Sequence, residues 1–589
     1  MRNEDRDREN TGASAGRKNG ANIGKKNAAN VGSHSATHHG TQGGTHNAVE
    51  IGADDNDRLS WGDTVFLHLE REGMPLNVAC VCVFEGEVSF KACVRFVESK
   101  LPLIPRYLKR VVAPPLGIGL PSWEYDPTFD IRNHVCEVTL KHGSDAELKT
   151  LAGKILSTVM DRQHPLWDMT LVRGLKGNRS ALVFRLHHCL ADGIAGVGIM
   201  NVVMDASPVA PRLPRRKLRI PIPAPRSVLS SLTNGFVDSY SGFAKRILAA
   251  MADVSSMAER FAVNGGNVAP DEFAGLLPEL SASTERLRFN VLYRGPQKFA
   301  CVEIPLADIK AIKRTCETSV NDVILALVTA TIRRYVVLHG DPVKGRLFRM
   351  MVPVNLRGSS DSAGELGNRI SLVPVTIPLD IRNPRKLLAA VHKRTEFLKR
   401  SHAAELVSLT GGLIGMFPTS AQALGGHILS RLPFTPFNMV CTNVPGPQVP
   451  LYLLGHEMLQ CYPYVPVGGE MALNCAILTY NGTAYFGFSG DAHAVPDLRR
   501  LEKLLQSSFT ELREAAGVEP PRKKEDKNKK KAQPKMKDTL AKVKAKVKLA
   551  SAPASAPAPV PIRPVASVES ATAPGPLVQG KEILAHAIA

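Results

Sequence analysis

The sequence predicts a mixed α/β (α+β) fold made of two similarly built halves, with disordered ends. Alternating runs typical of strands and apolar residues at helical spacing recur on both sides of a Pro- and Arg-rich connector. With 44% hydrophobic residues, the 589-residue chain can bury a substantial core. We expect a first half over residues 58–208, a basic connector with helices over 209–284, and a second half over 285–517.

The regular elements can be placed by their periodicity. In the first half, strands are predicted over residues 77–88 and 181–188, and helices over 90–101, 145–161 and 194–207. In the second half, strands are predicted over 288–295, 298–306, 347–356, 370–379, 437–444, 471–482 and 483–492. Helices are predicted over 320–339, 384–400, 403–430 and 495–516, and helical spacing also runs through 227–264 of the connector.

Both ends of the chain have the composition of disordered segments. Residues 1–57 are rich in Gly, Asn, Ala and His, and residues 518–589 are Lys-rich and then rich in Ala and Pro. Neither end can bury enough apolar surface to offset the entropy cost of ordering it. Within the second tail, a lysine-rich stretch with Leu540, Val543 and Val547 on one helical face fits an anionic membrane surface and a soluble tail equally well.

The net charge of +20 is concentrated in two segments. Residues 522–548 carry 13 Lys and Arg against 3 Asp and Glu, and residues 209–226 carry 6 basic residues and no acids. The rest of the chain is close to balanced, which disfavours a nucleic-acid-binding core and a nucleic-acid partner. Tails that are solvated, or attracted to anionic lipid, fit this distribution better.

Neither a membrane span nor an export signal is predicted. No run reaches the roughly 18 consecutive apolar residues that a spanning helix needs, and the charged N-terminus has no apolar stretch behind it. The ten cysteines show no zinc-type pairing and no compact disulfide framework, although Cys80 and Cys82 alternate on a strand-like run. We expect a cytoplasmic protein, peripherally associated with the inner face of the cell membrane or with lipid inclusions.

The most informative stretch is an HHxxxDG motif, formed by His187, His188, Asp192 and Gly193, where a strand ends and a helix begins. Neighbouring strand residues face opposite ways, so one imidazole can face a cavity while the protein holds the other. An imidazole with a pKa of about 6.5 is largely neutral at cellular pH and can accept a hydroxyl proton. Asp192 can brace the loop through a basic partner, and Gly193 allows a tight turn or close approach of a ligand.

Other chemistries fit this motif less well. Metal ligands on adjacent residues would point apart, and no further ligand cluster lies near them in the sequence. A G-x-S-x-G elbow for a serine nucleophile is absent from the sequence. Cys189 follows His188 directly, so the two side chains cannot face each other on a strand. A core histidine followed by an Asp-Gly loop remains the structural alternative.

These residues resemble the bacterial wax ester synthase/acyl-CoA:diacylglycerol acyltransferase family, within the coenzyme A-dependent acyltransferases that include chloramphenicol acetyltransferase. Residues 187–193 match the HHxxxDG motif of that family completely. Further matching blocks in the first half contain Ser60, Asp63, Phe66 and Glu70, and then Pro165, Leu166 and Trp167. Matching blocks in the second half contain Asn321 and Asp322, Pro353 and Arg357, Gly367 and Asn368, and Thr442, Asn443, Pro445 and Gly446. Asn355 departs from the serine common in the family, and the likeness covers roughly residues 59–516.

The resemblance implies two chloramphenicol-acetyltransferase-like lobes with an active-site tunnel at their interface. It implies that His188 is the general base, while His187, Asp192 and Gly193 shape the loop. The candidate substrate-binding or supporting residues are Pro165, Leu166, Trp167, Asn321, Asp322, Pro353, Arg357 and Asn443. For the polar residues of this set, capping a helix or satisfying a turn is an equally good interpretation, and Trp167 fits a core position better than a ligand contact. Neither a metal nor a bound cofactor is implied, because acyl-CoA is a substrate.

The leading functional hypothesis is therefore transfer of a fatty acyl group from acyl-CoA to diacylglycerol, with long-chain alcohols as further acceptors. Two alternatives stay open at the level of sequence. One is another CoA-dependent or condensation-type acyltransferase with a different acceptor. The other is a non-enzymatic lipid-surface binding protein that acts through its basic tail.

Overall fold

The computed structural model describes residues 58–114, 120–191, 193–210, 284–355, 370–400 and 436–519. Several predictions fall outside these residues: both disordered ends, the connector from 211 onward, the helix over 403–430, and the site residues Asp192 and Arg357. The mixed α/β fold class is confirmed by the elements that the structure does describe.

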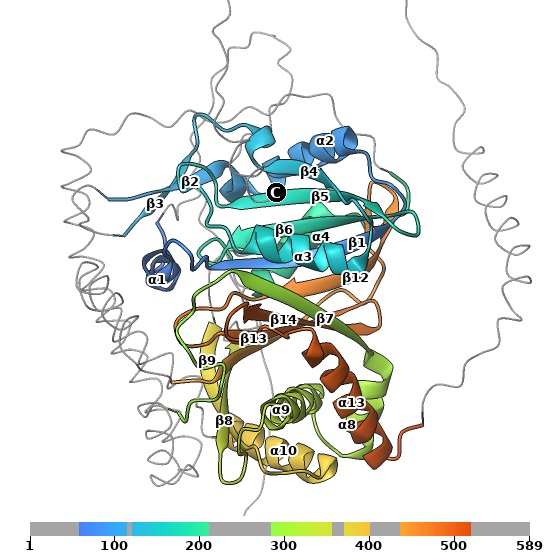
Figure 1. The fold of residues 1–589 in the computed structure, drawn as a ribbon. Helices are drawn as coiled ribbons and strands as arrows, with labels where there is room; N and C mark the ends of the chain where they lie inside the picture. The colour runs from blue at the N-terminus through green and yellow to red at the C-terminus, as the bar shows by residue number, and fades with distance from the viewer. Residues whose placement is uncertain are drawn as a thin grey trace, which may run out of the picture. The chain divides into compact units, whose positions relative to one another are not determined.

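The first sheet has six strands in the order β11-β12-β1-β6-β5-β4 (Figure 1). Its strands from the first half are β1 (Asn77–Glu85), β4 (Val135–Thr139), β5 (Trp167–Leu175) and β6 (Arg179–His187). The other two, β11 (Tyr452–Leu453) and β12 (His456–Tyr464), come from the second half of the sequence. Because β1 pairs antiparallel with both β6 and β12, backbone hydrogen bonds join the two halves within one sheet.

Among the described residues, four helices and a small two-stranded sheet complete the first half. The helices are α1 (Trp61–Leu69), α2 (Phe90–Lys100), α3 (Asp145–Leu156) and α4 (Gly193–Val203). Short 3-10 turns span Leu101–Leu103, Pro105–Leu108 and Ile131–Asn133, and β2 (Lys109–Val112) pairs with β3 (Ser122–Tyr125). The apolar stripe of α3, which includes Leu148, Leu151 and Ile155, packs on Val81 and Val83 of β1. That face of the first sheet is therefore buried under α3.

The second sheet also has six strands, in the order β7-β14-β13-β10-β8-β9. They are β7 (Gln297–Pro305), β8 (Leu347–Asn355), β9 (Ile370–Pro378), β10 (Met439–Pro445), β13 (Leu473–Tyr480) and β14 (Thr483–Asp491). Its helices are α8 (Leu306–Thr315), α9 (Val320–Leu338), α10 (Pro384–Arg400) and α13 (Arg500–Ala515). Figure 1 shows α9 lying between α10 and α13, next to the sheet. This position explains why α9 is buried on every side from Asp322 to Thr329.

The two sheets approach each other closely where β12 passes β14. A Cβ atom added to Gly487 of β14 would lie 1.8 Å from the carbonyl oxygen of Pro463 in β12. The contact between the sheets thus requires a residue without a side chain. Lys149 of α3 and Glu502 of α13 form an ion pair of 2.6 Å across the same junction.

Most of the predicted elements are confirmed, but the strand over residues 288–295 is wrong. The structure has turns and loop there, and the first strand of the second half begins at Gln297. Polar side chains bind the backbone groups that a strand ladder would use. Asn290 accepts from the Leu287 N–H, and the Asp491 carboxylate accepts from the N–H groups of Arg294 and Gly295.

None of the helices within the described ranges is both long enough and apolar enough to cross a bilayer.

Candidate active site

The two histidines of the motif occupy different environments at the end of β6. His187 is the last residue of the strand and is fully buried, whereas His188 is half-buried. The backbone is held on both sides: the His187 N–H donates to the Leu166 carbonyl at 3.0 Å, and the His188 N–H donates to the Leu76 carbonyl at 2.9 Å. The chain then enters α4 at Gly193, the last residue of the motif.

The ring of His187 is held by one contact on each nitrogen. Its Nδ1 accepts a hydrogen bond of 3.1 Å from the Cys189 N–H, so the ring proton is on Nε2. Nε2 lies 3.4 Å from Oε1 of Glu70, whose side chain is also buried. His187 is therefore enclosed between a backbone N–H and a buried carboxylate, and neither ring nitrogen faces open space.

Glu70 links both histidines to the rest of the fold. Its Oε1 accepts from the Leu76 N–H at 3.1 Å, and its Oε2 pairs with Arg162 at 3.0 Å. Burial alone would raise the pKa of the Glu70 carboxyl, but the contacts with His187, Leu76 and Arg162 outweigh it and lower the pKa. The carboxylate therefore stays charged, and Leu76 connects it to the backbone of His188.

Helix α1 supplies the aromatic contact of the second histidine, and Glu70 is the residue that caps its C-terminal end. Ser60 and Asp63 form a capping box that fixes the start of the helix. Phe66 and Glu70 are four residues apart and so lie on one side of it. The Phe66 ring stacks on the His188 ring, with centroids 3.9 Å apart and planes 7° apart. Sequence comparison noted these two residues without giving them a role, and it missed Arg162, which no motif contains.

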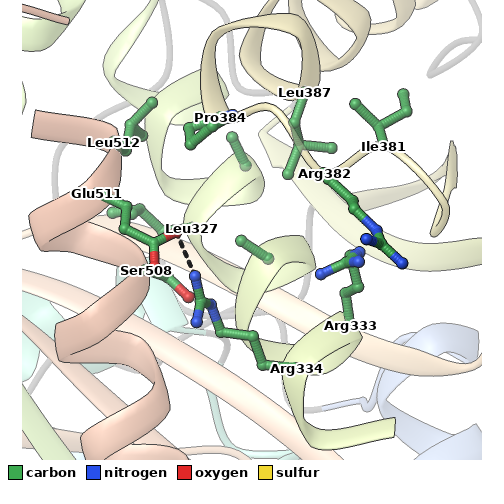
Figure 2. A pocket seen from close by; sticks show the side chains of 12 residues that line it. Leu327, Arg333, Arg334, Ile381, Arg382, Pro384, Leu387, Ser508, Glu511 and Leu512 are labelled. Carbon is green, nitrogen blue, oxygen red and sulfur yellow. Dashed lines mark hydrogen bonds and ion pairs between the residues drawn. The ribbon is translucent and has the colours of Figure 1, made fainter. Parts of the chain in front are cut away.

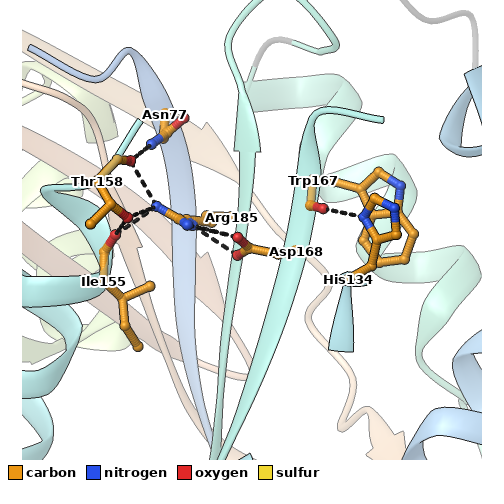
Figure 3. Close-up of polar contacts among 7 residues, drawn as sticks. All are labelled: Asn77, His134, Ile155, Thr158, Trp167, Asp168 and Arg185. Carbon is orange, nitrogen blue, oxygen red and sulfur yellow. Dashed lines mark hydrogen bonds and ion pairs between the residues drawn. The ribbon is translucent and has the colours of Figure 1, made fainter. Parts of the chain in front are cut away.

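A buried ion pair supports the end of β6 two residues before His187 (Figure 3). Arg185 pairs with Asp168 on the neighbouring strand at 2.7 Å. It also donates to the carbonyl oxygens of Ile155 and Thr158, at the end of α3, which satisfies acceptors that a helix terminus leaves unpaired. Asn77, which faces His187 across the β1–β6 pair, donates to the same Thr158 carbonyl. Helix α3 and strands β1, β5 and β6 are thereby tied together beside the motif.

Pro165, Leu166 and Trp167 are buried in the core next to the motif. Trp167 is 1% exposed, its indole N–H donates to the Tyr107 carbonyl, and its ring stacks on Tyr107 and His134. Leu166 is fully buried and contributes the carbonyl that accepts from His187. This geometry supports the core interpretation of Trp167, with the segment holding β6 in place.

Cys189 does not have the environment of a nucleophile. Its side chain is 1% exposed, and burial raises the pKa of its thiol well above the ordinary value. It contributes a backbone N–H to the site and not a thiolate. The half-buried His188 is thus the side chain of the motif, among its described residues, that is best placed to exchange a proton with a substrate.

Two family models match this chain in succession. The wax ester synthase/diacylglycerol acyltransferase catalytic domain matches residues 59–324, and the C-terminal domain of the same family matches residues 366–513. The chain belongs to the wax ester synthase/diacylglycerol acyltransferase family. It is therefore an acyltransferase, which argues against the alternative of a non-enzymatic lipid-surface binding protein.

Curated proteins that resemble this chain include several from mycobacteria. A probable diacylglycerol O-acyltransferase of Mycobacterium tuberculosis is 28% identical over 443 residues, which covers 74% of this chain and 91% of the relative. A second probable diacylglycerol O-acyltransferase of the same species is 27% identical over 474 residues, covering 78% of this chain and all of the relative.

Solved structures support the fold. The wax ester synthase/diacylglycerol acyltransferase from Marinobacter aquaeolei VT8 aligns with a TM-score of 0.54 at 22% identity, covering 78% of this chain and 100% of that one. The first condensation domain of the CDA synthetase aligns with a TM-score of 0.50 at 13% identity, covering 78% and 95%. The predicted acyltransferase-type fold is thus confirmed, while the tunnel between the halves stays a prediction.

The described family blocks of the second half lie on α9, β8 and β10. Asn321, at the start of α9, accepts a hydrogen bond of 3.3 Å from Asn443 of β10. Pro353 lies on β8, opposite Leu372 of β9. No distance places these residues beside His188, so their contact with substrate stays a prediction.

Asp322 has a structural environment. It is fully buried, completes a capping box with Ser319, and accepts from His392 at 2.8 Å and from Thr395 at 2.6 Å. Burial would raise the pKa of its carboxyl, but the hydrogen bonds from Thr395, Ser319 and His392 lower it. Asp322 therefore joins α9 to α10, and the capping interpretation is the one that the contacts support.

A surface pocket of about 370 Å³ lies away from the motif, between α9, α10 and α13 (Figure 2). Arg333, Arg334 and Arg382 line it together with Glu511, which pairs with Arg334. None of the residues that line it belongs to β6 or α4. This pocket is not where the histidines of the family motif would act.

We expect Asp322→Asn to lower the free energy of unfolding by about 1–3 kcal/mol at neutral pH, because an amide cannot replace both buried acceptor oxygens. The folded pKa lies below the unfolded value of 3.8, so the carboxylate stabilises the fold fully above that value. That contribution disappears as the pH falls through the folded pKa, and the two proteins should converge in acid. Chemical denaturation between neutral pH and pH 3 measures it, with the exposed Asp380→Asn as control. Unchanged stability with an altered KM would contradict a structural role.

Proposed function

We propose that this protein is an acyl-CoA:diacylglycerol O-acyltransferase with His188 as its general base. The names of its relatives support diacylglycerol as acceptor. The observation that carries the proposed mechanism is the contrast between the two histidines. His187 is buried and held on both nitrogens, whereas His188 is half-buried and stacked on Phe66. Of the two rings, the half-buried second one is the more accessible to a substrate.

The proposed reaction begins when His188 accepts the proton of the acceptor hydroxyl. We place this transfer at Nε2, because Nδ1 of His188 is buried. The hydroxyl oxygen attacks the thioester carbonyl, the carbon–sulfur bond breaks, and the thiolate of coenzyme A takes the proton back from the imidazolium. The products are an ester and free coenzyme A. Stacking on Phe66 fixes the plane of the ring, and such positioning lowers the entropic part of the barrier.

Long-chain alcohols are a second class of acceptor that the proposal includes. Like diacylglycerol, they react through a hydroxyl group. The matching family model is also named for wax ester synthesis. A condensation-type reaction has weaker support, because its solved representatives resemble this chain only at the level of fold. Product analysis with palmitoyl-CoA and competing dioleoylglycerol and hexadecanol distinguishes the acceptors.

We expect His188→Ala to reduce release of free thiol from palmitoyl-CoA, with dioleoylglycerol as acceptor, by roughly 10²–10⁴-fold. The loss should appear in kcat, because the ring acts on the transferred proton, and the circular dichroism spectrum should be unchanged. The exposed His142→Ala is the matched control and should retain normal turnover. Near-normal turnover of a folded His188→Ala protein would contradict the role of general base.

We also propose that the protein associates peripherally with anionic lipid through its basic segments, 209–226 and 522–548. The charge that these segments carry supports this proposal. A chain that ends at Glu519 should bind phosphatidylglycerol vesicles more weakly than the full chain, most clearly at low salt, because about 1 M salt screens charges beyond roughly 3 Å.

A second variant separates the charge of the tail from its length, because it keeps the length and removes part of the charge. Replacing Lys542, Lys544, Lys546 and Lys548 with Gln should weaken vesicle binding in the same direction as the truncation. Neutral phosphatidylcholine vesicles should bind all three proteins equally. Equal sedimentation of the full and shortened chains with anionic vesicles would dismiss the tail as an anchor.

A further inference from the structure

Three cysteines converge on the first sheet, on the opposite side from α3. Cys80 and Cys82 lie on β1, and Cys461 lies on β12. The Sγ atom of Cys461 is 3.3 Å from that of Cys80 and 3.6 Å from that of Cys82, and all three sulfur atoms lie within 4.8 Å of one another. We call these three residues the thiol cluster. Within the described ranges, no other group of three His, Cys, Asp or Glu side chains converges in this way.

The pairing of the strands explains why these side chains meet. Cys82 is directly opposite Cys461 in the antiparallel β1–β12 pair. Side chains of a strand alternate between its faces, and Val81 and Val83 already pack under α3. Cys80 and Cys82 must therefore point to the other face, where Cys461 also lies. No motif in the sequence could reveal this, because 379 positions separate Cys82 from Cys461.

A fourth sulfur atom lies beside the cluster. The Sδ atom of Met200, on α4, is 3.8 Å from the Sγ atom of Cys461. Cys82, Cys461 and Met200 are buried, with exposed fractions of 2%, 0% and 6%. Cys80 is only half-buried and is the most accessible of the three thiols. The site thus combines three thiols, one thioether and one accessible edge.

The distances fit a metal ion at the centre. A metal–sulfur bond of about 2.3 Å places the sulfur atoms of one trigonal or tetrahedral site roughly 3.7–4.0 Å apart. The separations of 3.3 and 3.6 Å are slightly shorter than that range and the third is within 4.8 Å, so small side-chain rotations would suffice. Thiolate and thioether donors without imidazole or carboxylate select soft ions, copper(I) above all.

We propose that the thiol cluster, with Met200 as an additional donor, is a binding site for a soft metal ion of the copper(I) class. The ion would join β1, β12 and α4, which come from both halves of the chain and include the helix that begins at the last residue of the HHxxxDG motif. Binding would replace the proton of each thiol that ionises with a metal–sulfur bond and release that proton to solvent. Oxidation is not required, because the ion enters in its reduced state.

The charge balance favours a monovalent ion in this buried position. Cys82 and Cys461 are buried, so the site favours a bound ion whose charge is balanced by the fewest thiolates. One thiolate and one monovalent cation are neutral together, which keeps the desolvation cost low. A divalent ion would need a second buried thiolate for the same balance.

The test is a competition for copper(I) under anaerobic conditions. The reduced full-length protein is titrated with copper(I) held by bathocuproine disulfonate, whose absorbance reports the copper that it retains. We expect the protein to withdraw one equivalent per chain and to unfold at a higher temperature once loaded, since the assembled site binds the ion more tightly than the unfolded chain does. X-ray absorption of the loaded protein should show a first shell of sulfur alone. Copper left with the chelator, or a shell of nitrogen and oxygen, would overturn the proposal.

Variants assign the site to these residues. Cys82→Ala and Cys461→Ala should each lose the equivalent of copper, and Met200→Leu, which conserves volume, should weaken binding about tenfold. Cys93→Ala, at a solitary buried thiol on α2, should bind as the unaltered protein does. If a buried variant fails to fold, the half-buried Cys80→Ser decides the question. Full binding by folded Cys80→Ser and Cys461→Ala proteins, or binding of zinc(II) in preference to copper(I), would contradict the proposal.

Discussion

The buried carboxylate of Glu70 is the contact on which the arrangement of the reactive motif depends. It faces the ring of His187 and accepts the N–H of Leu76, whose carbonyl accepts the N–H of His188. One charge therefore fixes the side chain of the first histidine and the backbone of the second. Arg162 pairs with the same carboxylate and balances its negative charge. Removing the carboxylate would leave buried donors without acceptors, which is more costly than the loss of an average hydrogen bond.

The first half cannot form this site without the second. Strand β1 lies between β6, which ends at the histidines, and β12, which comes from the second half of the sequence. Asn77 of β1 is the register partner of His187, so the pairing of β1 with β12 stabilises the strand next to the motif. The contact of Gly487 with Pro463 and the ion pair of Lys149 with Glu502 hold the two sheets at the same junction. The two halves of this acyltransferase are thus one cooperative unit around the motif.

Local pattern was enough to predict most elements and the position of His188, because helix periodicity and the HHxxxDG spacing are local signals. Local pattern could not predict contacts between segments that lie far apart in the sequence. Glu70 reaches His187 from the end of α1, and Arg162 reaches Glu70 from a loop. The pairing of β12 with β1 of the other half leaves no mark in sequence spacing. The false strand at 288–295 has the same cause, since Asn290 and Asp491 capture its backbone through tertiary hydrogen bonds. The Asp322 carboxylate was assigned to a site by resemblance, whereas its contacts are those of a helix cap.

The most direct test of this account is the single-turnover rate of acyl transfer in Glu70→Gln, with the protein saturated with palmitoyl-CoA and dioleoylglycerol. The amide keeps an acceptor for Leu76 but loses the charge that faces His187 and Arg162. We predict a folded protein whose rate falls about tenfold, equivalent to about 1.4 kcal/mol, with little change in substrate affinity. A folded Glu70→Gln protein that reacts at the unaltered rate would contradict the claim that this carboxylate positions the histidine proposed as general base.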